Sequence, residues 1–379
     1  MINKELLLQI AGHFGTPVYV YDLEKIREQY RKLSGAFSQL DTDIHFAVKS
    51  NHNPAIIKTI HEEGGQFDTV SLEEVLHLME LGIPKDDILF TPSCPSKEEL
   101  KKAFTAGIKI HIGSMEYLEW IAKEFPGRAF GLRINPGLDI GGNKKIATAH
   151  AHSKFGIPWA YHDELLNIIR SRQLKITGLH VHLGSDIGFT QMMKESIVFL
   201  ADIQQYFPDL EYLDIGGGFK IKYKEEDRET DMNELAQFIK KVLEESGRKL
   251  KIKIEPGKFL VAEAGKLLTR VNLIKKTPGK NFVCVNTGFN HFIRPMYYGA
   301  YHEIENISNP GAKPQIYDVV GNLCEEDTFA YDRPIPQVHE GDILSINNTG
   351  AYGYVMASHY NLRKLPKEII VDGNKIYEV

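Results

Sequence analysis

The sequence has 379 residues, of which 42% are hydrophobic and 25% charged, as in ordinary globular proteins. This length exceeds what one compact core usually supports, so we expect one large domain and a smaller one. The formal net charge of -5 gives no general attraction to nucleic acids or anionic membranes. The charge therefore favours small-molecule chemistry over the binding of polyanions.

The three cysteines, Cys94, Cys284 and Cys324, lie far apart in the sequence. Such an odd, sparse set does not build a disulfide framework and is typical of a reducing compartment. The first ten residues lack a signal-peptide cleavage pattern. No apolar run approaches the roughly 18 to 20 residues that span a bilayer. We therefore expect a cytoplasmic protein.

Residues from about 45 to 255 repeat one pattern: a short apolar run, a polar turn and a segment with helical periodicity. Alternating strands and helices predict a parallel sheet with right-handed crossovers. Eight such units predict a closed (β/α)₈ TIM barrel, an α/β fold, rather than an open sheet. The eight expected strands are His45–Val48, Phe67–Val70, Ile88–Phe90, Ile108–Ile112, Ala129–Ile134, Ile176–Val181, Tyr212–Ile215 and Ile252–Ile254. The polar stretch 135–157 predicts a long loop with a functional role.

Helical periodicity nearly vanishes after Gly265, which predicts a second, mainly β domain. Asp372-Gly373 is a hairpin signal near the end of this part. We expect the barrel domain to span residues 22–264 and the β domain to span 265–379, completed by residues 1–21. Its expected strands are 18–21, 267–273, 282–285, 316–320, 343–346, 368–371 and 375–379.

Residues with reactive or charged side chains follow the predicted barrel strands at one end. This end is the C-terminal face, where barrel enzymes have their active sites. Lys49 ends the first strand, His182 the sixth and Glu255 the eighth. A lysine at such a rim is either an ordinary solvated charge or a partly buried amine. Partial burial lowers an amine pKa towards Schiff-base chemistry.

Three further features of this rim have alternative interpretations. Gly216-Gly217-Gly218 offers backbone N–H groups to a phosphate, or only makes a tight turn. His180 and His182 share one strand face. They form a core pair, part of a metal site without an obvious third ligand, or a place where one imidazole stacks on a planar cofactor. A buried Glu255 needs a cation, either a protonated pyridine nitrogen or Arg133 across the barrel.

Several motifs together resemble those of fold-type III pyridoxal-phosphate-dependent decarboxylases. These motifs are FAVKSN at 46–51, HVHLGS at 180–185, DIGGGF at 214–219 and IEPG at 254–257. Further motifs look like those of the diaminopimelate decarboxylase family: RPMYYGAYH at 294–302, GNLCE at 321–325, GAYG at 350–353 and MASHYN at 356–361. The resemblance runs in order from about residue 15 to residue 365, nearly the whole chain.

The resemblance implies decarboxylation of meso-2,6-diaminopimelate to L-lysine with pyridoxal 5'-phosphate as cofactor. It implies that Lys49 holds the cofactor as a Schiff base and that Cys324 protonates the carbanion after carbon dioxide leaves. The other cofactor-binding residues would be His182 against the ring, Ser185, Gly217 and Gly218 at the phosphate with Tyr352 beside them, and Glu255 at the pyridinium nitrogen. The substrate-binding residues would be Lys258, Arg294, Tyr298, Glu325 and Tyr352.

The resemblance also implies a homodimer with shared active sites, because in the family Cys324 and Glu325 reach into the neighbouring subunit. Glu255 disfavours an alanine racemase, in which an arginine faces the pyridine nitrogen. A regulatory homologue without catalysis is disfavoured because Lys49 and Cys324 are both present.

Lys258 is the main departure from the family pattern, which usually has arginine after Glu-Pro-Gly. A lysine cannot reproduce the bidentate fork with which arginine holds a distal carboxylate. The change would weaken that contact by about 1–2 kcal/mol. In addition, Cys324-Glu325-Glu326-Asp327 is one residue tighter than usual, and Asn322 stands where proline is common. The rival function is a decarboxylase of another amino acid, a carboxylated polyamine or a carrier-linked amino acid.

Overall fold

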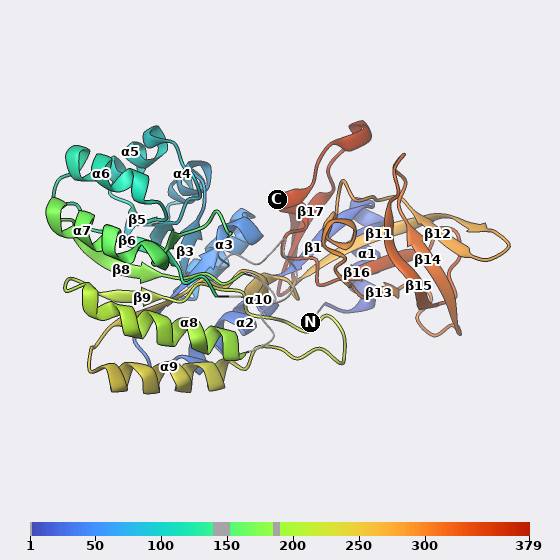
Figure 1. Ribbon diagram of the computed structural model, residues 1–379. Helices are drawn as coiled ribbons and strands as arrows, with labels where there is room; N and C mark the ends of the chain where they lie inside the picture. Colours follow the sequence, from blue (N-terminus) through green and yellow to red (C-terminus); the bar gives the residue numbers. More distant parts are fainter. Residues whose placement is uncertain (1, 139–151, 185–189) are drawn as a thin grey trace.

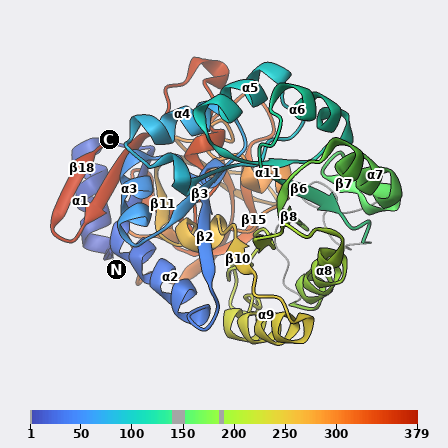
Figure 2. The ribbon, with the colours of Figure 1, turned by 90° about the vertical axis from the view of Figure 1, so that its left-hand side faces the viewer.

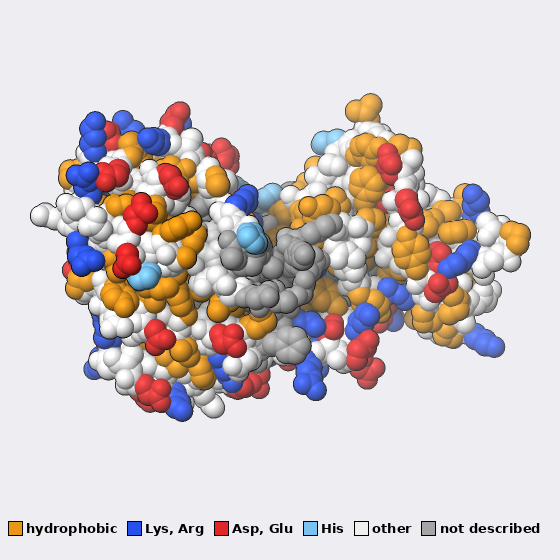
Figure 3. Space-filling view, viewed as in Figure 1, with side chains coloured by type: hydrophobic (Ala, Val, Ile, Leu, Met, Phe, Trp, Pro, Cys, Tyr) orange, Lys and Arg blue, Asp and Glu red, His pale blue; other side chains and the backbone are white. Residues whose placement is uncertain are grey.

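The computed structural model describes residues 2–138, 152–184 and 190–379. These residues form two lobes, a barrel of strands and helices and a second, mainly β lobe (Figure 1). The molecule narrows between the two lobes in the space-filling view (Figure 3). None of the described helices is long and apolar enough to cross a membrane.

The first lobe is a closed barrel of eight parallel strands. The strand order β5-β4-β3-β2-β10-β9-β8-β6 closes because β5 also pairs with β6. The helices form a ring around the strands (Figure 2). The barrel strands are β2 (Thr42–Ala47), β3 (Gln66–Thr69), β4 (Ile88–Phe90), β5 (Lys109–Ile112), β6 (Phe130–Asn135), β8 (Ile176–His180), β9 (Tyr212–Asp214) and β10 (Lys251–Ile254). The helices are α2 (Leu23–Ala36), α3 (Pro54–Glu62), α4 (Leu72–Glu80), α5 (Lys97–Ala106), α6 (Leu118–Glu124), α7 (His162–Arg172), α8 (Thr190–Ile203), α9 (Met232–Ser246) and α10 (Lys258–Val261).

The barrel interior is filled by polar and aromatic side chains that need glycine on neighbouring strands. A Cβ at Gly178 would lie 2.0 Å from Cζ of Tyr212, and one at Gly131 would lie 2.3 Å from Cδ2 of His111. The Tyr212 hydroxyl lies 2.9 Å from Nε2 of His111. The two glycines therefore make room for two rings that are joined by a hydrogen bond across the barrel.

The second lobe is a sheet in which the N-terminal strand occupies a central place. Strand β1 (Val18–Asp22) pairs antiparallel with β11 (Gly265–Lys276) and parallel with β17 (Lys367–Asp372). Helix α1 (Lys4–Phe14) covers it with buried Leu7 and Ile10. The other elements are β12 (Asn281–Val285), α11 (Arg294–Tyr298), β13 (Ile304–Asn306), β14 (Pro314–Val320), β15 (Thr328–Pro336), β16 (Ile343–Asn347) and β18 (Lys375–Glu378).

The predicted barrel and mainly β second part are confirmed, with strand ends moved by up to three residues. The sequence analysis did not predict α1, β13, β15 or the two-residue β7 (Ile157–Pro158). Strand β15 contains Pro334 and Pro336, which interrupt a strand pattern. Most of the predicted loop 135–157 lies outside the described residues.

Candidate active site

Lys49 lies at the C-terminal end of the barrel, in the 3₁₀ turn Val48–Ser50 that follows β2. The turn is held on both sides. Ser50 Oγ donates to the Ala47 carbonyl at 2.7 Å, and the Asn51 side chain accepts from the Asn53 N–H at 3.0 Å. Asn53 then caps α3. The backbone around Lys49 is therefore fixed before any ligand binds.

The Lys49 amine is paired with Asp68, which lies near the end of β3. Its Nζ is 3.3 Å from Oδ2 of Asp68, whose side chain is 1% exposed. Burial alone would lower the pKa of Lys49, but the charges of Asp68, Tyr352 and Glu255 raise it above its usual value. Burial and then Glu255 raise the pKa of Asp68 to about 7, against the effect of Lys49. The pair joins a protonated amine to a carboxyl group that titrates near neutral pH.

Glu255 follows β10 and is buried beneath the same rim. Its Oε2 lies 3.3 Å from Nε2 of His180 and 3.9 Å from Nδ1 of His182. Its Oε1 has no hydrogen-bond partner among the described residues. Burial raises the pKa of Glu255, and the charges of Lys49 and Arg133 oppose that shift. Such a carboxyl group fits a cationic nitrogen as its missing partner.

Arg133, the predicted alternative partner of Glu255, makes no ion pair with it in the described part of the chain. The Arg133 guanidinium instead lies 4.8 Å from the centroid of the Phe155 ring. The charge of Arg133 still favours ionised Glu255 and Asp68. Arg133 therefore contributes a general positive field to the rim.

His182 is held in one tautomer by the glycine loop. The Gly217 N–H donates to Nδ1 of His182 at 3.1 Å, so Nδ1 carries a lone pair and Nε2 carries the proton. Burial, with the charges of Lys49 and Arg133, lowers the pKa of His182 well below its usual value. The ring is neutral at pH 7.

The backbone of the glycine loop contacts the backbone of the turn that follows β10. The Glu255 N–H donates to the Gly216 carbonyl at 2.8 Å, and a Cβ at Gly217 would lie 2.0 Å from the Glu255 carbonyl oxygen. Gly218 has a φ of 92°, a conformation that favours glycine. Ser185, predicted beside this loop at the phosphate, lies outside the described residues.

His111, His180 and Glu255 place potential metal-ligand atoms within 4.8 Å of one another. The sequence analysis found no third ligand beside His180 and His182, and the structure places His111 beside His180 instead. Both nitrogens of His111 already have partners, since Nδ1 lies 3.2 Å from the Thr91 hydroxyl and Nε2 lies 2.9 Å from the Tyr212 hydroxyl. His111 is thus part of the barrel core, and we assign no metal to this cluster.

Tyr352 brings the second lobe to the rim of the barrel. Its N–H donates to the Ser50 carbonyl at 2.8 Å, and the Asn51 amide donates to the Gly350 carbonyl at 2.9 Å. Tyr352 has a φ of 54°, an unusual conformation for a tyrosine. Burial raises its pKa, whereas the charges of Lys49 and Arg294 lower it. Tyr352 is therefore close to both of these cations.

Arg294 and Lys258 lie around one histidine. Arg294 Nε donates to Nε2 of His302 at 3.3 Å, and its Nη2 donates to the Tyr223 hydroxyl at 3.3 Å. The Tyr298 ring centroid lies 5.9 Å from Cζ of Arg294. Burial lowers the pKa of His302 to about 3, and the charges of Arg294 and buried Lys258 lower it too. The structure thus places Arg294 against neutral His302 and near Tyr298, with Lys258 close enough for its charge to act on His302.

Cys324 and Glu325 lie in a separate, exposed cluster of the second lobe. The Asn361 amide donates to Sγ of Cys324 at 3.2 Å, and the Tyr360 hydroxyl donates to Oε1 of Glu325 at 2.8 Å. Hydrogen bonds from Asn361 and Tyr360 lower the pKa of the Cys324 thiol. No contact within the described residues of this chain joins the cluster to Lys49 or Arg294.

Sequence reasoning assigned no role to several polar residues of these clusters. The sequence pattern predicts Asp68 only as part of the strand 67–70, although its side chain contacts Lys49 at the rim. His302, Tyr360 and Asn361 lie within recognised motifs, but their hydrogen-bond partners are not adjacent in sequence. Tyr223 follows the glycine loop in a polar stretch that carries no motif.

Comparison with known proteins gives the same assignment along the chain. Residues 23–262 match the family model "Pyridoxal-dependent decarboxylase, pyridoxal binding domain". Diaminopimelate decarboxylase of Methanothermobacter thermautotrophicus is 34% identical over 97% of this chain and 90% of its own, and that of Archaeoglobus fulgidus is 36% identical with the same coverage. The crystal structure of diaminopimelate decarboxylase from Helicobacter pylori complexed with L-lysine has a TM-score of 0.91 at 32% identity, covering 99% of this chain and 95% of the other.

The residues at the rim fit the cofactor that this family uses. A buried carboxyl group with one unmatched oxygen, a neutral imidazole beside it and a strand-end lysine are the groups that a pyridine aldehyde needs. The backbone approach at Gly217 keeps the loop that would face a phosphate free of side chains. The chain belongs to the pyridoxal-phosphate-dependent decarboxylases, as a member of the diaminopimelate decarboxylase family.

Proposed function

We propose that the protein decarboxylates meso-2,6-diaminopimelate to L-lysine and carbon dioxide. The observation that carries the proposal is the cluster of Arg294, Tyr298 and Lys258 around His302. Tyr352 is close enough to both Lys49 and Arg294 for their charges to lower its pKa. A substrate with a reacting amino-acid head at Lys49 therefore has a second set of polar groups for a distal head.

Lys49 would hold the cofactor covalently through its amine, and Asp68, 3.3 Å from that amine, would keep it in place. Pyridoxal phosphate supplies an electron sink for the electron pair that carbon dioxide leaves behind. Glu255 would hold a positive charge on the ring nitrogen, because its buried carboxyl group gains most from a cationic partner. His182 would lie against the ring as a neutral imidazole. The phosphate would be held by Gly217, Gly218 and Ser185.

Arg294 would bind the distal carboxylate of the substrate. His302 accepts from its Nε and Tyr223 from its Nη2, so the guanidinium is oriented before the substrate arrives. A pre-oriented guanidinium loses little further freedom on binding, which favours a charged hydrogen bond. Tyr298 and Tyr352 would line the same path.

Cys324 would give a proton to the substrate carbon after carbon dioxide leaves, and Glu325 would bind the distal ammonium group. No contact among the described residues joins either of them to Lys49, which supports a homodimer whose partner subunit supplies them. Leu362, beside Asn361 of the Cys324 cluster, is 95% exposed, as expected of a surface that another subunit covers. We place the enzyme in the cytoplasm, where the free cysteines remain reduced.

The domain boundaries proposed from the sequence separate the proposed cofactor-binding residues from most of the proposed substrate-binding and proton-donating residues. Residues 22–264 would hold the cofactor, and residues 265–379 with 1–21 would contribute the substrate-binding and proton-donating residues. The pairing of β1 with β11 and β17 supports the assignment of the N-terminal residues to the second domain.

A second candidate function follows from Lys258. This lysine is buried next to the Arg294 cluster, where the family usually has an arginine. A single ammonium group cannot bind a carboxylate through two parallel hydrogen bonds, so it would hold a distal carboxylate less firmly than an arginine does. A decarboxylase of another amino acid, a carboxylated polyamine or a carrier-linked amino acid would use the same cofactor chemistry.

Carbon dioxide release from the purified, cofactor-loaded enzyme tests the two candidates. The substrates offered are meso-diaminopimelate, lysine, ornithine, arginine and carboxynorspermidine. We expect turnover on meso-diaminopimelate with lysine as product, and we expect Lys258→Arg to preserve it. Turnover on another substrate only, lost in Lys258→Arg, would overturn the proposed substrate.

A further inference from the structure

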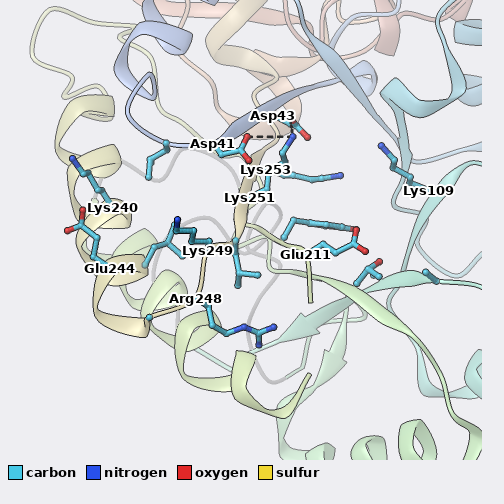
Figure 4. Close-up of a pocket in the computed structure, with 18 of the residues that line it drawn as sticks. Asp41, Asp43, Lys109, Glu211, Lys240, Glu244, Arg248, Lys249, Lys251 and Lys253 are labelled. Carbon is cyan, nitrogen blue, oxygen red and sulfur yellow. Dashed lines mark hydrogen bonds and ion pairs between the residues drawn. The ribbon is translucent and has the colours of Figure 1, made fainter. Parts of the chain in front are cut away.

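A large cavity lies at the N-terminal ends of the barrel strands, far along the barrel from the rim that carries Lys49. Its volume is about 1020 Å³. Its walls come from the first residues of β5, β6, β9 and β10 and from the turn after α9 (Figure 4). Small-molecule sites occupy about 300–1,000 Å³, so the cavity can admit a metabolite.

Lys253 is the buried cation of this cavity. Its side chain is 3% exposed, and its amine lies 4.0 Å from the centroid of the Tyr212 ring. No described carboxylate oxygen lies within 4.0 Å of the amine. Burial lowers the pKa of Lys253 to about 8, although Asp214 opposes that shift. A buried ammonium group without an anion beside it is unfavourable, so this position favours an anionic ligand.

Lys251, two residues earlier on the same strand, provides the contrast. Its Nζ lies 2.9 Å from Asp43 and 3.6 Å from Asp41, so its charge is compensated within the protein. Figure 4 shows the Lys251 amine turned towards these two carboxylates. The Lys253 side chain extends away from them, towards the side from which Lys109 projects.

Lys109 and His45 add further donors near Lys253. The Lys109 amine donates to the Asp86 carbonyl at 2.7 Å, which leaves two of its three N–H groups for a ligand. His45 is 1% exposed, and neither of its ring nitrogens has a hydrogen-bond partner among the described residues. It lies two residues after cavity-lining Asp43 on β2, so both side chains point to the barrel interior.

We propose that this cavity binds a small dianion, a phosphate or dicarboxylate group held between Lys109 and Lys253. The lysine amines would supply the charge-assisted hydrogen bonds, and the dianion would compensate the Lys253 charge. Glu211 and Glu244 line the same cavity and repel an extended polyanion. The site is therefore selective for a compact anionic group.

Calorimetric titration of the cofactor-loaded enzyme with inorganic phosphate and, separately, with succinate tests the proposal. We expect one of the two probes to bind, and its identity distinguishes a phosphate ligand from a dicarboxylate. Lys253→Met should weaken that binding by at least about tenfold, since it removes the uncompensated ammonium group. Lys109→Met should weaken binding of the probe similarly. Because Lys109 is exposed, this variant tests the proposal even if Lys253→Met does not fold.

Lys240→Met is the matched control. Lys240 lines the same cavity from α9, and Figure 4 shows it beside Glu244 and away from Lys109 and Lys253. We expect the Lys240→Met variant to bind the same probe with a dissociation constant within about twofold of that of the wild type, since the proposed contacts to Lys109 and Lys253 remain. Absence of binding by both probes, or equal affinity in the wild type and the Lys109 and Lys253 variants, would overturn the proposal. Arg294→Met should leave binding of the probe unchanged. Loss of binding in Arg294→Met would place the anion at the C-terminal rim and would also overturn the proposal.

Discussion

The Lys49–Asp68 pair shows how a single contact sets the charge state of the rim. Nζ and Oδ2 are 3.3 Å apart, and Asp68 is almost fully buried. Burial raises the pKa of the carboxyl group, and the amine beside it limits that rise. A carboxyl group that titrates near pH 7 makes the rim sensitive to pH in the physiological range.

Asp68→Asn should therefore change the pH dependence of stability of the cofactor-free protein. The folded pKa of about 7 lies above the unfolded value, so between about pH 4 and pH 7 the folded state holds a proton that the unfolded state has lost. Stability of the wild type should fall as pH rises through this window, by up to about 1.4 kcal/mol per pH unit. Thermal unfolding from pH 4 to pH 8 should show the wild-type Tm falling relative to that of the variant. Parallel curves would exclude this titration.

Lys49→Ala should abolish covalent attachment of the cofactor, because the Lys49 amine is the proposed attachment point. Borohydride reduction followed by intact-mass measurement should show the added mass of the reduced cofactor in the wild type and not in the variant. Lys266→Ala, which removes another partly buried lysine, is the control and should keep the added mass. Reducible covalent cofactor in Lys49→Ala would refute the assignment.

Residue types at strand ends were predictable, whereas pairs formed by folding were not. Lys49 and Glu255 stand out because each directly follows an apolar run. Asp68 lies inside such a run, and only the parallel pairing of β3 with β2 brings it to Lys49. The contact between Cys324 and Tyr360 joins residues 36 positions apart, and no sequence period indicates it.

At the scale of elements, hydrogen bonds join the loops after β8, β9 and β10. The Gly216 carbonyl accepts from the Glu255 N–H, and the Gly217 N–H donates to His182. The three loops are thus connected at the rim through the backbone groups of Gly216 and Gly217. The barrel itself was predictable from its repeated apolar runs. Strands β13 and β15 were not, because short length and prolines hide the two-residue period.

Gly217→Ala should disturb these connected loops, because the added methyl group would meet the Glu255 carbonyl oxygen at 2.0 Å. We expect a loss of about 1–3 kcal/mol in stability and weaker cofactor binding. Chemical denaturation and cofactor titration measure the two effects. Gly35→Ala, in the exposed last turn of α2, has open space around the new methyl group and should be neutral or stabilising. Equal behaviour of the two variants would contradict this account of the loop.

At the scale of the whole molecule, the proposed catalytic and substrate-binding residues lie in two separate clusters. Lys49, Glu255 and Arg294 lie around the barrel rim, whereas Cys324 and Glu325 lie in an exposed cluster of the second lobe. A twofold dimer makes the same contact twice, so each partner can complete the other's site. The sequence motifs indicated these residues, but their separation within one chain required the structure.

Mixing two inactive variants tests this division. Lys49→Ala and Cys324→Ala should each be inactive or slow, yet half of the randomly reassembled dimers would be mixed. Each mixed dimer would contain one site with both native residues, so about one quarter of wild-type activity should return. Activity that stays at the level of the separate variants after reassembly would rule out shared sites.

Strand β1 has a consequence for how the chain is made. It precedes the barrel in the chain, but both of its partners, β11 and β17, are synthesised after the barrel. The barrel can therefore fold during synthesis, while β1 must wait with two unpaired edges and an apolar face. Completion of the second lobe is a late event, and a stalled or truncated chain exposes this strand to aggregation or to quality control.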